Sequence, residues 1–319
     1  MKLTRHRFTR MSTLGRVVVP AAMLLVATSC GSGDSGESAD TTDAADTTEA
    51  AVETTAAATT ATETPGDAGG GLDVSLFADG ALVGDPETVD CTLSGGEESS
   101  CYELTIAGYP ADYDVGPFCP STIEDSAEEG GVWFDGEDIY DLDGQFFVDL
   151  PELYGDDNWQ LYDDEGNVFV TDTEEAFDGA ARPDVEEQYQ NHCVEGRLEW
   201  LDDGEPVEQT VQIPVEPVAA DGVTRSRGNS GITLQGVVIA EAAPVDAILG
   251  AYTIASFDDC GGHFNPVEGY HLHGELGCSS VGGATEGDTA MFGYAMDGFA
   301  VFSPFEEGEE PDDLDECNG

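Results

Sequence analysis

Three histidines lie within eleven residues of one another toward the C-terminal end of the chain: His263, His271 and His273. His271 and His273 are two residues apart, and on a β-strand this spacing places both side chains on the same face. Two imidazoles on one face can share a metal ion, at Zn–N distances of about 2.0–2.1 Å. We therefore predict that the three histidines bind a divalent transition metal, zinc or copper.

Nearby carboxylates give this prediction two forms. Asp258, Asp259 and Glu275 are close enough in sequence to complete the metal site or to orient the imidazoles from behind. The alternative is a hydrogen-bonded cluster of histidine and aromatic side chains that shapes the loop and binds no ion.

Motifs of common enzyme classes are missing from the sequence. It contains no Gly-x-Ser-x-Gly elbow, no His-Glu-x-x-His helix and no phosphate-binding loop. Lys2 is the only lysine, so a chain processed at its N-terminus has none for a lysine-dependent serine or Schiff-base mechanism. Three hypotheses follow: a metal-binding module, which we favour, a metal-dependent hydrolase or oxidase, and a structural or adhesive ectodomain. Of these, the sequence favours a binding role over an enzymatic one.

The elements that must position the histidines are expected to be mainly β-strands, with a few short helices. Alternating apolar residues and Gly- or Asp-containing turns predict a hairpin over residues 88–108 and further strands. The other strand segments are 132–134, 139–140, 159–163, 168–171, 198–201 and 210–215. The best helix covers 244–249, with Pro244 in its first turn and Gly250 as its stop. The polar stretch 217–228 divides this ectodomain into halves at 73–216 and 229–319.

The cysteines are interpreted as disulfides. No Cys-x-x-Cys pair occurs, which disfavours zinc-ribbon and thioredoxin-like sites, and an exported chain favours disulfides. Spacing does not fix the connectivity; proximity along the chain favours Cys91–Cys101, Cys119–Cys193 and Cys260–Cys278, with Cys317 unpaired.

The first thirty residues resemble a lipoprotein signal peptide. A basic segment is followed by a short apolar run and by Ala27-Thr28-Ser29-Cys30, in which Cys30 is the expected site of lipid attachment. Residues 31–72 are rich in Gly, Ser, Asp, Thr, Ala and Glu without aromatic residues, which predicts a disordered acidic tether. We expect an exported protein that is anchored to the membrane through an N-terminal lipid.

Charge restricts the choice of partners. The chain has 67 acidic and 9 basic residues, and five of the basic ones precede Cys30. A surface this anionic repels phosphate backbones, so nucleic acid and anionic lipid surfaces are poor partners. The acidity suits a saline medium or attracts cations.

Several sequence blocks resemble YHYH-domain proteins. The naming tetrad corresponds to Tyr270-His271-Leu272-His273, in which Leu272 replaces the second tyrosine. The blocks are 116–120, 258–263, 269–274, 293–299 and 313–319, and the resemblance covers 85–319. It implies an extracytoplasmic module but no particular reaction. Family members continue to a second Tyr-His-Tyr-His copy and a further cysteine, so we expect a longer chain that would supply a partner for Cys317.

Overall fold

The computed structural model describes residues 5–6, 71–136, 138–219, 228–278, 285–286 and 289–303. Cys30, Cys317, most of the predicted tether and nearly all of the predicted signal peptide lie outside these ranges. The tether was predicted to reach residue 72, but Leu72 is buried and its N–H donates to the Val215 carbonyl at 3.2 Å. The fold therefore includes the last described residues of that segment.

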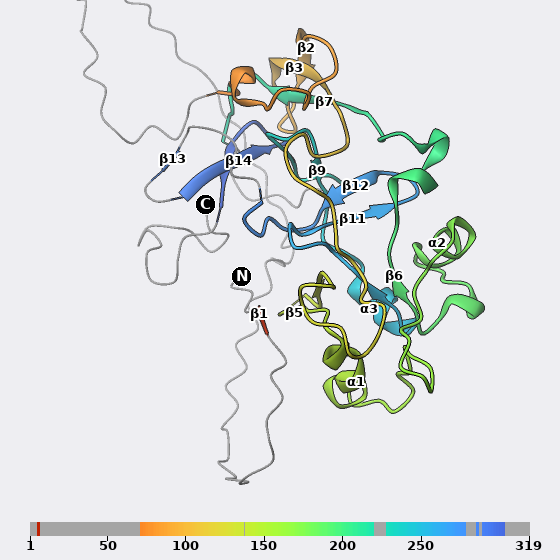
Figure 1. Ribbon diagram of the computed structural model, residues 1–319. Coiled ribbons are helices and arrows are strands. Elements are labelled where there is room, and N and C mark those ends of the chain that lie inside the picture. The colour runs from red at the N-terminus through yellow and green to blue at the C-terminus, as the bar shows by residue number, and fades with distance from the viewer. Residues whose placement is uncertain are drawn as a thin grey trace, which may run out of the picture. The chain divides into compact units, whose positions relative to one another are not determined.

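The prediction of a β-rich fold with few helices is confirmed (Figure 1). The strands are β1 (Arg5–His6), β2 (Glu87–Thr92), β3 (Glu98–Ile106), β4 (Val132–Phe134), β5 (Ile139–Asp141), β6 (Cys193–Val194), β7 (Gln209–Pro214), β8 (Gly231–Thr233), β9 (Val238–Ile239), β10 (Ile254–Ala255), β11 (Gly262–Asn265), β12 (Gly269–Leu272), β13 (Thr285–Glu286), β14 (Thr289–Ala295) and β15 (Ala300–Phe302). The α-helices are α1 (Gly144–Leu153), α2 (Glu174–Ala180) and α3 (Val245–Gly250), and 3-10 turns cover Val74–Leu76, Glu187–Tyr189, Leu198–Trp200 and Asp202–Gly204.

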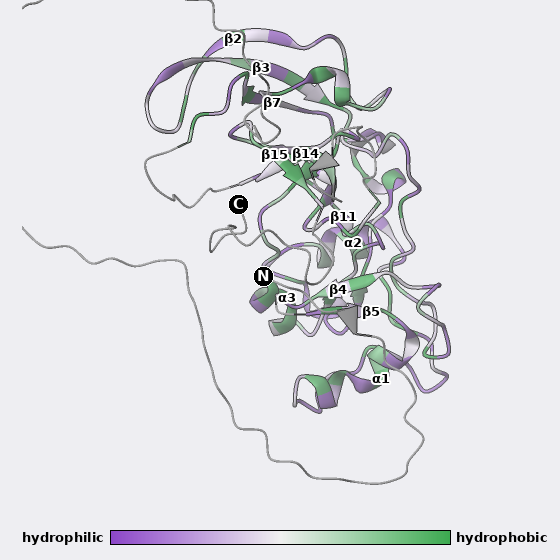
Figure 2. Cartoon of the chain, turned by 90° about the vertical axis from the view of Figure 1, so that its left-hand side faces the viewer, coloured by the Kyte–Doolittle hydropathy of each residue, from purple (hydrophilic) through white to green (hydrophobic). Residues whose placement is uncertain are grey.

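The predicted hairpin is formed by β2 and β3, and β7 pairs with the other edge of β3. Cys91 and Cys101 are bonded across this hairpin with a Cα–Cα distance of 5.8 Å. Buried Leu104, Ile106 and Ile213 from β3 and β7 join a core cluster with Ile232 of β8. In Figure 2 the outer strand β2 is coloured mostly hydrophilic, as an edge strand in contact with solvent should be.

The sheet that carries the histidines has the order β11-β12-β9-β8-β14, with β13 and β15 both paired to β14. β12 runs antiparallel to β11 and parallel to β9, so it has a partner on both edges. Every residue of β12 is buried. A strand fixed on both sides cannot slide, which makes β12 a rigid support for His271.

A second core lies around β4, β5 and α1. Trp133 and Phe257 are fully buried there and their rings stack with centroids 6.3 Å apart. The main chain of Val132 exchanges hydrogen bonds with that of Phe257, which joins β4 to the segment that leads into β11. Cys119 and Cys193 are bonded beside this core, where β6 pairs in parallel with β10.

Some elements differ from the prediction. Residues 198–201 were predicted as a strand, but Leu198–Trp200 forms a 3-10 turn, and the segments 159–163 and 168–171 share only the bridge between Tyr162 and Val168. Two helices were missed. Gly144 and Pro151 in the α1 segment suggest a loop, yet the helix is stabilised by burial of Phe146, Phe147 and Leu150.

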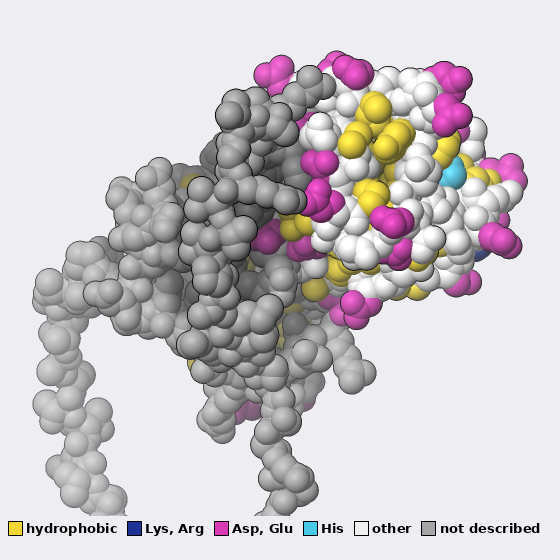
Figure 3. Space-filling model, turned by 90° about the horizontal axis from the view of Figure 1, so that it is seen from below, with side chains coloured by type: hydrophobic (Ala, Val, Ile, Leu, Met, Phe, Trp, Pro, Cys, Tyr) yellow, Lys and Arg dark blue, Asp and Glu magenta, His cyan; other side chains and the backbone are white. Residues whose placement is uncertain are grey.

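Acidic side chains are spread over the face shown in Figure 3, where apolar groups lie between them. Within the described ranges no helix combines the length and the apolar character that crossing a membrane requires.

A capping hydrogen bond begins α1, because the Asp143 carboxylate accepts from the Phe146 N–H at 2.8 Å. Replacement Asp143→Ala should lower the free energy of unfolding by about 1 kcal/mol, since it removes the acceptor of an otherwise unpaired N–H. Asp143→Asn retains an acceptor and should cost clearly less. Urea denaturation of both variants tests this, and equal losses would mean that charge and not capping stabilises the helix.

Candidate metal centre

The β11–β12 hairpin places two of the three histidines directly opposite each other. The register of this antiparallel pair joins His263 to His271 and Phe264 to Tyr270. Side chains of directly opposed residues lie on the same face of a sheet, so both imidazoles occupy one side of the hairpin. His273 follows His271 by two residues, and its ring lies with them. The convergence expected from the spacing is therefore present in the fold.

The three ring nitrogens form a nearly equilateral triangle. Nε2 of His263 lies 3.1 Å from Nε2 of His271 and 3.2 Å from Nε2 of His273, and the last two atoms are 3.1 Å apart. An ion with Zn–N bonds of about 2.0–2.1 Å would contact all three from about 1 Å outside their plane. In the described part of the chain, these three histidines are the group of side chains whose ligand atoms lie close enough together to hold one metal ion.

Main-chain carbonyls fix the orientation of two rings. Nδ1 of His271 donates to the Gly269 carbonyl at 3.1 Å, and Nδ1 of His273 donates to the Glu241 carbonyl at 2.6 Å. A carbonyl only accepts, so the proton of each neutral ring is at Nδ1 and the lone pair is at Nε2. Each lone pair is directed toward the centre of the triangle. A hydrogen bond at the second nitrogen is also how proteins commonly orient metal-bound histidines.

This arrangement leaves too few protons for a cluster held by hydrogen bonds alone. Nε2 of His271 and Nε2 of His273 face each other at 3.1 Å with a lone pair on each. Of the three rings, only His263 can supply a proton at the centre, so at most one of the three short contacts between rings is a hydrogen bond. A cation at the centre would turn the repulsion between these lone pairs into attraction.

Burial keeps the imidazoles neutral. Loss of solvent around His263, with further repulsion from the other two rings, lowers its pKa well below the usual value. The same burial lowers the pKa of His271, and it lowers the pKa of His273 to about 4. The fully buried ring of Phe257 forms one wall, with its centroid 4.5 Å from that of His263 and 5.3 Å from that of His273. Neutral rings at pH 7 offer their lone pairs to a metal without first losing a proton.

Asp258 holds the hairpin and does not contact the imidazoles in the way the sequence suggested. Its Oδ1 accepts from the N–H groups of Cys260 and Gly262 at 3.1 and 3.0 Å, and its Oδ2 accepts from the Tyr270 hydroxyl at 2.7 Å. Burial raises the pKa of this carboxyl, while these hydrogen bonds oppose the rise. The predicted orienting role belongs instead to the two main-chain carbonyls.

The other predicted carboxylate at the C-terminal side of the hairpin also has a different role. Glu275 accepts from the Gly277 N–H at 2.7 Å and from the Ser303 hydroxyl at 3.1 Å. No carboxylate, including those of Asp259 and Glu275, groups with the three ring nitrogens within the described residues.

Close packing around the hairpin requires glycine at its start. A Cβ on Gly262 would lie 2.3 Å from the Tyr270 hydroxyl oxygen, and one on Gly261 would lie 2.2 Å from the Gly274 carbonyl oxygen. The predicted Cys260–Cys278 disulfide is formed and closes the segment that contains all three histidines. The hairpin is thus fixed at both ends before any ligand binds.

Sequence reasoning missed three residues at the site. The Glu241 carbonyl orients His273, and a main-chain group has no signal in the sequence. Asn265 ends β11 and Glu268 lies in the turn before β12, with the Glu268 carboxylate 3.9 Å from Nε2 of His271. Their signal was proximity to His271 within the Asn-Pro-Val-Glu-Gly turn.

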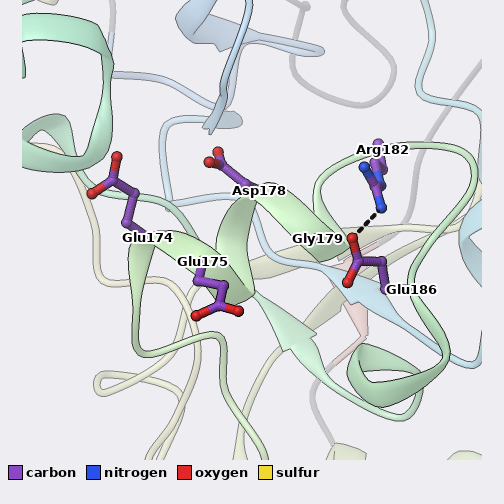
Figure 4. Close-up of a pocket in the computed structure, with 6 residues that line it drawn as sticks. All are labelled: Glu174, Glu175, Asp178, Gly179, Arg182 and Glu186. Carbon is purple, nitrogen blue, oxygen red and sulfur yellow. Dashed lines mark hydrogen bonds and ion pairs between the residues drawn. The ribbon is translucent and has the colours of Figure 1, made fainter.

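The surface pocket along α2 has a different character (Figure 4). Glu174, Glu175 and Asp178 point outward along it, and Arg182 pairs with Glu186 at 2.6 Å. Exposed acidic groups with one ion pair are usual for a solvated surface, so this pocket adds no chemistry.

Comparison with known families identifies the region around the histidines. Residues 210–313 match the family model described as YHYH protein. This match to the YHYH family covers about a third of the chain. The matched region begins in β7 and includes the sheet from β8 to β15, so the three histidines lie inside it. No curated protein and no solved structure matches the chain at a significant level.

The Tyr270–Asp258 hydrogen bond should be important for the stability of the region that contains the histidines. Tyr270→Phe leaves Oδ2 of Asp258 with only the long contact to the Gly116 N–H at 3.3 Å among the described residues, and should lower the free energy of unfolding by about 1–3 kcal/mol. Tyr113→Phe is the matched control, because its hydroxyl lies 3.5 Å from that of Tyr270 and forms a weak contact. Similar small losses in both variants, measured by urea denaturation, would contradict this role of Asp258.

Proposed function

We propose that this protein is an exported lipoprotein, attached to a membrane through Cys30, whose YHYH domain binds one zinc or copper ion through His263, His271 and His273. The observation that carries the proposal is the triangle of Nε2 atoms at 3.1–3.2 Å, with two of the lone pairs fixed toward its centre. Imidazole suits zinc and copper better than it suits magnesium or calcium, which prefer oxygen ligands.

Export and anchoring are supported by the N-terminal sequence and by the cysteines. The basic segment, the apolar run and the block that ends at Cys30 have the order of a lipoprotein signal. The described fold contains three disulfides, which persist in oxidising compartments outside the cytosol. An acidic tether would hold the metal-binding domain away from the anionic membrane surface.

Metal uptake by the full chain in detergent, stripped with a chelator and with its disulfides intact, tests the proposal. Calorimetry at pH 7 should show one zinc or copper ion per chain. His271→Ala/His273→Ala should weaken binding by at least about a hundredfold, because it removes two of the three ligands. Even the loss of a residue that only hydrogen-bonds a metal ligand lowers metal affinity by about 10–100-fold. His192→Ala is the control, since that half-buried ring contacts the Gln190 carbonyl and lies outside the cluster.

Two results would contradict the metal function. Negligible uptake by the wild-type chain would leave the structural or adhesive ectodomain as the remaining hypothesis. Equal uptake by the wild type and by the double variant would place the bound ion on the acidic surface instead of the histidines.

A metal-dependent hydrolase is the second candidate, and one observation favours it. Within the described residues the cluster contains three protein ligands, which leaves a coordination position for water, as in catalytic zinc sites. The zinc-loaded chain should then hydrolyse a chromogenic ester faster than His271→Ala/His273→Ala at the same zinc concentration. Equal rates would restrict the function to binding.

A further inference from the structure

Among the described residues, Glu268 is the carboxylate that comes closest to the three ring nitrogens. Its Oε2 lies 3.9 Å from Nε2 of His271, and its side chain is 35% exposed. The ligands of a tetrahedral zinc ion lie about 3.3 Å apart, given bonds of about 2.0–2.1 Å. The larger separation suits a ligand placed between the ion and the carboxylate better than direct coordination by Glu268.

Asn265 holds this carboxylate in place. Its Oδ1 accepts from the N–H groups of Val267 and Glu268 at 2.8 and 2.7 Å, which turns its amide nitrogen outward. That Nδ2 donates to Oε2 of Glu268 at 2.8 Å and lies 3.5 Å from Nε2 of His271. The lone pair of Nε2 on the His271 ring points toward the side where an ion would bind. The Asn265 amide contacts Nε2 from that side, so Asn265 and the Glu268 carboxylate bonded to it lie there as well.

We infer that Glu268 accepts a hydrogen bond from the ligand in the fourth coordination position, so that the ion binds neutral hydrogen-bond donors, such as water or an alcohol hydroxyl, in preference to anions. The inference rests on the metal function proposed above. Asn265 is a positioning residue that keeps the carboxylate aimed at this ligand.

The electrostatic reason is direct. Three neutral imidazoles leave an ion with its full double positive charge, which by itself would attract anions. A carboxylate in hydrogen-bond contact with the fourth ligand repels a second negative charge there, and it forms a charge-assisted hydrogen bond with a neutral O–H. The site therefore favours ligands that can donate a hydrogen bond to Glu268.

Azide binding to the cobalt-loaded full chain tests this selection. Co²⁺ can take the place of zinc, and its visible spectrum changes when an anion enters the coordination shell. Removal of the negative charge in Glu268→Gln should raise the affinity for azide by at least about tenfold. Glu275→Gln is the matched control, because it removes a charge two residues after His273 from a carboxylate that does not group with the ring nitrogens, and its azide affinity should stay within about twofold of wild type.

Equal azide affinities in the wild type and in Glu268→Gln, with normal cobalt uptake by both, would overturn the inference and leave the metal function intact. An equal rise in both charge variants would also overturn it, because the effect would then be a general one of net charge. Absence of cobalt, zinc and copper uptake by the wild type would instead reject the metal function itself.

Discussion

The register between β11 and β12 is the constraint on which the candidate site depends. It places His263 opposite His271, and a slip by one residue would turn one of these rings to the other face of the hairpin. Asp258 fixes the start of the hairpin through its main-chain hydrogen bonds and Tyr270, and Asn265 fixes the turn at the other end. The Cys260–Cys278 disulfide adds a covalent limit to the same segment. These restraints are independent of the histidines, so the site is preformed by the hairpin.

The neighbouring strand β9 is needed to orient the third histidine of the site. Parallel pairing of β12 with β9 places the segment after β9 alongside His273, where the Ala240 N–H donates to the Leu272 carbonyl at 2.8 Å. The next residue supplies the carbonyl that orients the third ring. The hairpin alone would therefore hold two imidazoles, of which His271 has an orienting carbonyl, and the orientation of the third depends on the segment after β9. This dependence explains why the chemistry needs a domain and not just a loop.

The sequence predicted those features of the fold and the site that depend on the spacing of residues close together in the chain. Histidines at i and i+2 predicted a shared face, alternation predicted the β2–β3 hairpin, and the order of the cysteines favoured the three pairs that form. It did not predict the features that depend on packing between residues far apart in the chain. Helix α1 contains Gly144 and Pro151 and is stabilised by the core that it joins, while Glu241 acts through an atom that every amino acid has. The roles of Cys30 and Cys317 lie outside the described residues and stay predictions.

Orientation of the rings by main-chain oxygen atoms has an evolutionary consequence. Where a carboxylate orients a histidine, one substitution removes the support and changes the charge behind the ring. At Gly269 and Glu241 the supporting atom belongs to the backbone, so this support does not depend on the side chain at position 241 as long as the segment after β9 keeps its path. Drift in sequence can therefore alter the surface around the histidines while their protonation pattern is inherited unchanged with the fold.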